Sequence, residues 1–198
     1  MSVFQESFHY LHDAREAWRE EEPSACVICN MLCACYGFIQ MHEEGYDEYR
    51  VCGPCLVSGR LAEKNLHVND GDIETLHQQL HERFREMPEE ERNALATKRT
   101  SEIELRTPRP SVLNLFIWPA HCGDYCVYFR RVNAEDMNRL APDGDGRSFL
   151  ASHLPLDYED VDEDLLQNVW EEKLQGFLRF YLWQCTHCSQ YLLTCDSD

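Results

Sequence analysis

Two short stretches, Cys26-Val27-Ile28-Cys29 and Cys52-Gly53-Pro54-Cys55, decide how this chain folds. Two residues separate the cysteines in each stretch, so a tight turn can direct both thiolates at one metal ion. Two such turns complete the tetrahedral four-thiolate site that zinc prefers, with Zn–S bonds of about 2.3 Å. The spacing between the pairs is typical of paired zinc knuckles. We therefore predict a structural Zn²⁺ site at Cys26, Cys29, Cys52 and Cys55; buried reduced cysteines are the alternative.

A third pair, Cys185 and Cys188, lies near the end of the sequence and needs two more ligands to hold a second zinc. Cys122 and Cys126 are the best candidates, because a turn at Gly123 can bring them together. Their spacing is also that of one helical turn, so the second site stays open at this point. Two histidines are in reserve as ligands: His121 and His187.

Nucleophilic catalysis is the other interpretation of His121, Cys122 and Asp124, a thiol beside a base and an orienting carboxylate. Catalytic groups usually meet through the fold and not as sequence neighbours. No glutamate stands out to activate a zinc-bound water, and a catalytic zinc needs an open position. We therefore expect no enzyme. The remaining cysteines are interpreted as structural or free thiols: Cys33, Cys35 and Cys195.

Composition and charge limit the possible functions of the 198-residue chain. Apolar residues make up 43%, enough for a core, and no run approaches the roughly 20 apolar residues of a membrane span. The first residues lack the basic start and apolar run of a secretory signal, so we expect a cytoplasmic protein with reduced thiols. The net charge of −18 opposes direct binding to nucleic acid and favours a basic protein partner.

The densest acidic segment is the candidate surface for that partner. Its six carboxylates fall within eight positions: Asp157, Glu159, Asp160, Asp162, Glu163 and Asp164. They lack the spacing of a calcium loop. A solvated loop or helix start is the alternative interpretation. Four nearby aromatic residues can anchor a partner, although such residues more often belong to a core: Trp170, Phe177, Tyr181 and Trp183.

Hydrophobic spacing predicts an α+β fold. A short helix is expected over 56–64. An amphipathic helix is expected to begin after an N-cap at Asp72 and to end at Pro88. Pro88 is also expected to begin the next helix. Strands are expected over 126–132, 180–183 and 191–194, the last two forming a hairpin around Cys185 and Cys188. The aromatic-rich residues 1–22 are expected to pack onto the domain. We predict one compact domain over 1–198, with a zinc-ribbon-like part at 23–66 and a C-terminal part at 107–198 that carries the zinc-knuckle hairpin.

Several recognisable motifs follow one another along the chain: Tyr10-Leu11-His12-Asp13, Cys26-Val27-Ile28-Cys29, Cys52-Gly53-Pro54-Cys55, Arg106-Thr107-Pro108, Trp118-Pro119-Ala120-His121-Cys122-Gly123-Asp124-Tyr125-Cys126 and Tyr181-Leu182-Trp183-Gln184-Cys185-Thr186-His187-Cys188. In this order they resemble the CbrC family of uncharacterised bacterial proteins linked to colicin tolerance. The resemblance implies a role in surviving bacterial toxins and no known reaction.

Together with the acidic charge, the resemblance leads to one functional expectation. The chain is expected to be a zinc-binding immunity protein that binds and neutralises a cognate secreted toxin, one acting on nucleic acid, because such toxins carry basic clefts. A zinc-ribbon adaptor in stress response or transcription is the first alternative. A zinc-dependent enzyme is the second.

Overall fold

Helices and small, mostly antiparallel sheets make up the computed structural model, which describes residues 7–112, 117–153, 167, 170 and 178–197. The predicted α+β class is confirmed. Contacts divide the chain into two units, Met1–Val127 with Thr186–Cys188 and Tyr128–Cys185 with Ser189–Asp198, so the division falls inside the predicted part 107–198. Within the described ranges, no helix has both the length and the apolar character needed to cross a bilayer.

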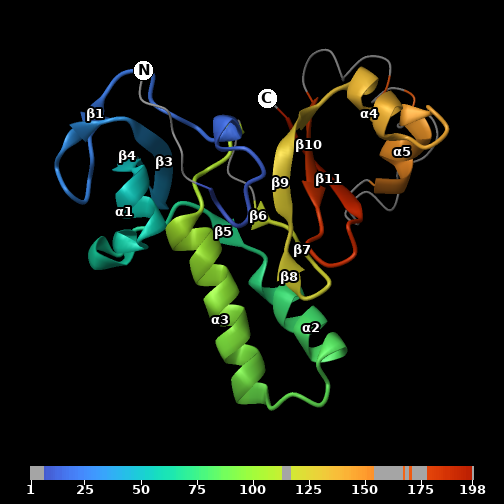
Figure 1. Cartoon of the computed structure of the whole chain (residues 1–198), viewed down its shortest axis with the longest axis horizontal. Coiled ribbons are helices and arrows are strands. Elements are labelled where there is room, and N and C mark those ends of the chain that lie inside the picture. The colour runs from blue at the N-terminus through green and yellow to red at the C-terminus, as the bar shows by residue number, and fades with distance from the viewer. Residues whose placement is uncertain (1–6, 113–116, 154–166, 168–169, 171–177, 198) are drawn as a thin grey trace. The chain divides into compact units, whose positions relative to one another are not determined.

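Two antiparallel hairpins open the first unit. Strand β1 (Ser24–Ala25) pairs with β2 (Leu32–Cys33), and β3 (Cys35–His42) pairs with β4 (Gly45–Cys52), as Figure 1 shows in blue and teal. The second hairpin was not predicted from the sequence. Both faces of its first half are buried, so the alternation of polar and apolar residues that reveals a half-exposed strand is missing.

The N-terminal segment packs against β3, as expected for its described part. The ring of Phe8 meets that of Tyr36 edge-on at 5.5 Å between centroids. The amide of Gly37 donates to the carbonyl of Trp18 at 3.1 Å, and a side chain at position 37 would collide with the indole ring. A short 3₁₀ turn, Ala14–Glu16, interrupts this segment.

The helix expected over 56–64 is in fact two short pieces, α1 (Gly53–Val57) and a 3₁₀ turn, Arg60–Lys64. Pro54 lies in the first turn of α1, where its missing N–H costs nothing. Gly59 has φ +70°, a left-handed conformation that no continuous right-handed helix accommodates. The second Cys-x-x-Cys therefore bridges the end of β4 and the start of α1.

Two longer helices follow. Helix α2 (Ile73–Arg83) begins at the predicted N-cap, where a carboxylate oxygen of Asp72 accepts from the amide of Thr75 at 3.0 Å. Helix α3 (Glu89–Arg106) starts after Pro88, with three glutamates in its first turn that favour the positive end of the helix dipole. Each helix buries one stripe; for α2 it is Leu76 and Leu80.

Four two-residue strands complete the first unit: β5 (Asp70–Gly71), β6 (Ile117–Trp118), β7 (Ala120–His121) and β8 (Asp124–Tyr125). The first two pair in parallel, and the last two form an antiparallel hairpin. Trp118 and Tyr125 are fully buried beside them. Trp118 donates to the carbonyl of Cys126 at 2.7 Å, and the Tyr125 hydroxyl lies 3.0 Å from that of Thr100. The buried indole N–H and phenol hydroxyl thus both have partners, and the contact of Tyr125 with Thr100 joins the hairpin to α3.

The second unit contains a three-stranded sheet in the order β11 (Tyr191–Ser197), β10 (Leu178–Gln184) and β9 (Val127–Val132), drawn in red and yellow in Figure 1. The predicted hairpin around the last cysteine pair is confirmed by the antiparallel register of β10 and β11. Two helices, α4 (Ala134–Leu140) and α5 (Gly146–His153), complete the unit. The core is formed by Val132, Met137, Ala141, Phe149, Leu150, Phe180, Leu182 and Leu193.

Capping explains why α4 and α5 form, two helices that were not predicted from the sequence. Asn133 and Asp136 form a reciprocal capping box at the start of α4. Asp145 caps α5, accepting from the amides of Arg147 and Ser148 at 3.1 and 3.2 Å. These acidic residues serve local helix starts.

Candidate metal-binding sites

The four cysteines of the first two pairs converge. Cys26, Cys29, Cys52 and Cys55 each offer a sulfur, and all four sulfurs lie within 4.8 Å of one another. The sulfurs of Cys29 and Cys52 are 3.8 Å apart. Three of the four residues are buried. We call these four residues the first ligand group; it could hold a metal ion.

A tight backbone turn presents the first pair. The amide of Asn30 donates to the carbonyl of Cys26 at 2.8 Å, and the amide of Cys26 donates to the carbonyl of Met31 at 3.0 Å. Asn30 closes the turn with φ +59°, a conformation that asparagine tolerates better than most residues. A further bond from Val27 to the Arg50 carbonyl, 2.7 Å, ties this turn to β4, which carries Cys52.

The sulfurs of this group differ in their electrostatic surroundings. Burial raises the pKa of Cys26, but hydrogen bonds from the backbone N–H groups of Cys29, Cys52 and Ile28 outweigh it and lower the pKa to about 6. Burial raises the pKa of Cys52 and of Cys55. Several thiolates cannot share such a space without a cation, so the group is suited to bind a metal when all four are deprotonated.

A second ligand group forms around the last cysteine pair. His121, Cys122, Cys185 and Cys188 each offer one ligand atom, again within 4.8 Å of one another. The Nδ1 atom of His121 lies 3.5 Å from the sulfur of Cys188. This group is more open than the first, because Cys188 is exposed and His121 and Cys122 are half-buried.

Cys126 is not a member of this group, which corrects the ligand set expected from the sequence. The turn of the β7–β8 hairpin lies at Cys122 and Gly123, so His121 pairs with Asp124 across it. Cys126 is two residues beyond Asp124 and buried, and its amide donates to the carbonyl of Pro119 at 3.0 Å. The reserve ligand His121 is in the group, and the other, His187, is not.

The turn that presents Cys185 and Cys188 repeats the backbone pattern of the first knuckle. The amide of Ser189 donates to the carbonyl of Cys185 at 3.1 Å, and the amide of Cys185 donates to the carbonyl of Gln190 at 2.9 Å. Ser189 has φ +60°, as Asn30 has +59°. The same chain geometry thus serves a cysteine pair in both groups.

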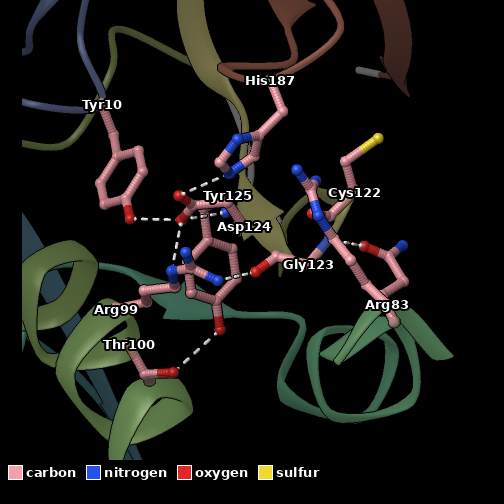
Figure 2. A network of polar contacts seen from close by, with 10 residues as sticks. Tyr10, Arg83, Arg99, Thr100, Cys122, Gly123, Asp124, Tyr125 and His187 are labelled. Carbon is pink, nitrogen blue, oxygen red and sulfur yellow. Dashed lines mark hydrogen bonds and ion pairs between the residues drawn. The ribbon is translucent and has the colours of Figure 1, made fainter. Parts of the chain in front are cut away.

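Side chains from α2 and α3 hold the turn that presents His121 and Cys122, as Figure 2 shows in part. Gln79 accepts from the Gly123 amide at 2.8 Å and donates to the Ala120 carbonyl at 3.1 Å. Arg83 donates to the Cys122 carbonyl at 2.5 Å, and Arg99 donates to the Gly123 carbonyl. Because both Cys122 and Gly123 have positive φ, these bonds offset the strain of a left-handed cysteine.

Asp124 is the centre of a buried polar network in the same region (Figure 2). Its carboxylate accepts from the Tyr10 hydroxyl at 2.6 Å, lies 3.2 Å from Nε of Arg99 and lies 3.3 Å from Nε2 of His187. Burial and the bond to Asp124 raise the pKa of Tyr10, which stays a neutral donor. Since His187 is next to Cys188, the network positions the loop that carries a ligand of the second group.

Comparison with known families gives one match. The model of the uncharacterised protein family UPF0167 matches residues 6–197. The chain belongs to this family. The matched region contains both ligand groups and nearly all of both units. Comparisons with curated proteins and with solved structures gave no match.

A cavity of about 560 Å³ opens beside the second group, and its walls include His121, Cys122 and Cys188. Glu82, Arg83 and His187 also line it. Sequence reasoning did not single out Glu82 or Arg83, because their relation to the cysteines arises from the packing of α2 against β7 and β8.

The other residues expected to act on a partner divide into three cases. The acidic segment 157–164 and Phe177 lie outside the described residues. Tyr181 and Trp183 are buried in the sheet of the second unit, so they are core residues. Trp170 is half-buried and packs against the core of that unit.

Proposed function

We propose that this chain is a cytoplasmic immunity protein that binds zinc at both ligand groups and neutralises a cognate antibacterial toxin acting on nucleic acid. The observation that carries the zinc part is interatomic distance. For Zn–S bonds of about 2.3 Å, sulfurs at the corners of a tetrahedron lie about 3.8 Å apart, and a sulfur and a nitrogen about 3.6 Å apart. The sulfurs of Cys29 and Cys52 are 3.8 Å apart, and the sulfur of Cys188 lies 3.5 Å from Nδ1 of His121.

Four protein ligands at each site leave no open position, which favours a structural role for both ions. When bound, zinc would supply folding free energy by crosslinking segments that are distant in sequence. The chain's own residues do the rest: tight turns aim the ligands, and Gln79, Arg83 and Arg99 hold the hairpin that carries two of them. A protein built in this way is suited to present a rigid binding surface, which lowers the ordering cost of association.

Two features support the choice of partner. The net charge of −18 complements a basic protein and speeds its encounter. Toxins that act on nucleic acid need basic clefts, because their substrates are polyanions. The resemblance to the CbrC family adds the link to colicin tolerance. We assign the encounter surface to the acidic segment 157–164.

Kinetics of association test that assignment. Replacing Asp160, Asp162, Glu163 and Asp164 by Asn or Gln should slow association with the toxin about tenfold and flatten its salt dependence. The matched control replaces four exposed carboxylates elsewhere, Glu21, Glu22, Glu43 and Glu44, by Gln, which makes the same change in net charge. Equal effects of the two quadruple variants would show that only overall charge matters and would remove the acidic segment as the docking surface.

Identification of the toxin tests the function itself. The chain is co-expressed with the product of the adjacent upstream gene, purified by a tag on either partner, and scored for rescue of growth. A stable complex with rescue supports immunity. If co-expression does not rescue growth and the chain instead captures a transcription or stress-response protein, the result would support the adaptor alternative.

The cavity beside the second group favours one further candidate, a zinc-dependent hydrolase. Glu82, exposed in the wall of that cavity, is a carboxylate that such a reaction could use as a base. This function requires that one of the four ligands leave the metal. The test is hydrolysis of a general ester substrate by the wild type and by Glu82→Gln. Activity that is lost in the variant while its zinc content stays unchanged would favour the enzyme over the immunity protein.

A further inference from the structure

Cys33 and Cys35 lie beside the first ligand group and belong to neither group. Their sulfurs are 4.0 Å apart. Residues two apart in an extended chain are separated by about 6.7 Å, so a sulfur distance this short means that the two side chains lean toward each other. We propose that Cys33 and Cys35 form a reversible thiol–disulfide pair, oxidised by low-molecular-weight disulfides of the glutathione type.

The backbone between the two cysteines can close the remaining distance. Cys33 ends β2, where it pairs with Ser24, and Cys35 begins β3, where it pairs with Cys52. Ala34 between them belongs to no strand. The extended spacing of about 6.7 Å is at the upper end of the 4.4–6.8 Å range of α-carbon distances that disulfides usually require. Because the chain changes its partner strand at Ala34, a small bend there can shorten this distance.

Exposure assigns a different part to each thiol. Cys33 is half-buried and can meet a small disulfide from solvent, whereas Cys35 is fully buried. Cys33 is therefore the attacking residue and Cys35 the resolving residue. The buried position of Cys35 keeps it from a second glutathione molecule, so the mixed disulfide resolves within the protein.

The reaction is a two-step exchange. The Cys33 thiolate attacks the disulfide of oxidised glutathione, forming a mixed disulfide and releasing one glutathione thiolate. The Cys35 thiolate then attacks the Cys33 sulfur, which releases the second glutathione. Two protein thiols lose two electrons, one glutathione disulfide gains them, and the two thiol protons pass to the released glutathiones.

Cysteines bound to a metal are protected from this exchange, since their thiolates are engaged as ligands. The free pair is thus the first part of the cysteine-rich region to respond to an oxidant. Neither sulfur is a ligand, so oxidation of the pair should leave the metal in place. This inference does not depend on the identity of the toxin.

Intact-mass spectrometry of the metal-containing protein tests the pair. After treatment with oxidised glutathione, the wild type should lose the mass of two hydrogen atoms, retain its metal, and recover both hydrogens with excess reduced glutathione. Cys33→Ser should show no loss. Cys35→Ser should stop with one glutathione attached. Cys195→Ser, the matched control, should behave as the wild type.

Two results would overturn the proposal. Loss of two hydrogens that persists in Cys33→Ser would assign the disulfide to other cysteines. Release of metal in parallel with the loss of two hydrogen atoms would show that the ligand thiolates are oxidised instead. Both readouts are independent of immunity, so they separate this inference from the proposed function.

Discussion

The Nδ1 atom of His121 lies 3.5 Å from the sulfur of Cys188, although 67 positions separate the two residues in the chain. The contact depends on a hairpin turn with two consecutive positive-φ residues, Cys122 and Gly123, which directs His121 toward the last knuckle. This relationship determines which residues complete the second ligand group.

Substitution of His121 should remove one of two metal ions. His121→Ala leaves three ligands at an exposed site, so we expect the zinc content to fall from about two ions per chain to about one. Elemental analysis of protein purified without chelator makes the measurement. Cys126→Ser is the control, because that buried cysteine is outside the group; a loss of zinc in this variant as well would restore Cys126 as a ligand.

Removal of the first metal should unfold the region around it. In Cys29→Ser, or after chelation under reducing conditions, we expect amides of β1 to β4 to exchange with solvent at least tenfold faster, because metal-binding free energy is folding free energy in such elements. Hydrogen exchange resolved by peptide gives the readout. The amides of α5 serve as the internal control, and equal acceleration there would point to global unfolding.

Loss of the Asp124 charge should cost more stability than loss of one of its hydrogen-bond partners. Asp124→Asn leaves Arg99, whose side chain is only 15% exposed, without its carboxylate, and should lower the free energy of unfolding by about 3 kcal/mol. Tyr10→Phe deletes one hydrogen bond and should cost about 1–2 kcal/mol. Chemical denaturation at fixed zinc concentration compares them; equal costs would argue against a shared network.

A pH-dependent contribution is expected from Asp136 in the second unit. Burial raises its pKa, but bonds from Arg130 at 2.9 Å and from the Asn133 amide outweigh it, so the folded pKa is lowered. A lowered pKa gives stability that is present above the unfolded value near 3.9 and is lost as the pH falls through the folded value.

Asp136→Asn tests this sign. At neutral pH we expect the variant to be less stable by about 1–3 kcal/mol, and the difference from the wild type should shrink as the pH falls below about 4. Urea unfolding of the two proteins across pH gives the curve. Both proteins carry the same ligand groups, so any loss of metal in acid affects them equally and cancels when their free energies of unfolding are subtracted. A difference in free energy that does not change with pH would contradict the lowered pKa of Asp136.

Glycine should be favourable where the knuckles need a left-handed residue. Ser189→Gly removes the strain of φ +60° and should raise the free energy of unfolding by about 0.5 kcal/mol, after the added entropy of unfolded glycine is subtracted. Asn30→Gly should gain less, because asparagine tolerates this conformation. Thermal unfolding compares them with Ser189→Ala, which keeps the strain; a gain in the alanine variant would point to the side chain and not to φ.

The spacing of residues along the chain was enough to predict part of this architecture. The N-cap at Asp72, the helix start after Pro88 and the hairpin around the last cysteine pair are all local, and each depends on residues a few positions apart. The first ligand group was also expected, because Cys-x-x-Cys restricts the turn so strongly that little other geometry is available.

The sequence by itself therefore determined the two knuckles and the cysteines that they carry, since tight turns are fixed by local backbone preferences. Only the tertiary structure decided that His121 and not Cys126 completes the second group, and that Asp124 joins Tyr10, Arg99 and His187. Those outcomes depend on where α2 and α3 pack against the β7–β8 hairpin. Such packing is the sum of many distant contacts, and no spacing along the chain encodes it.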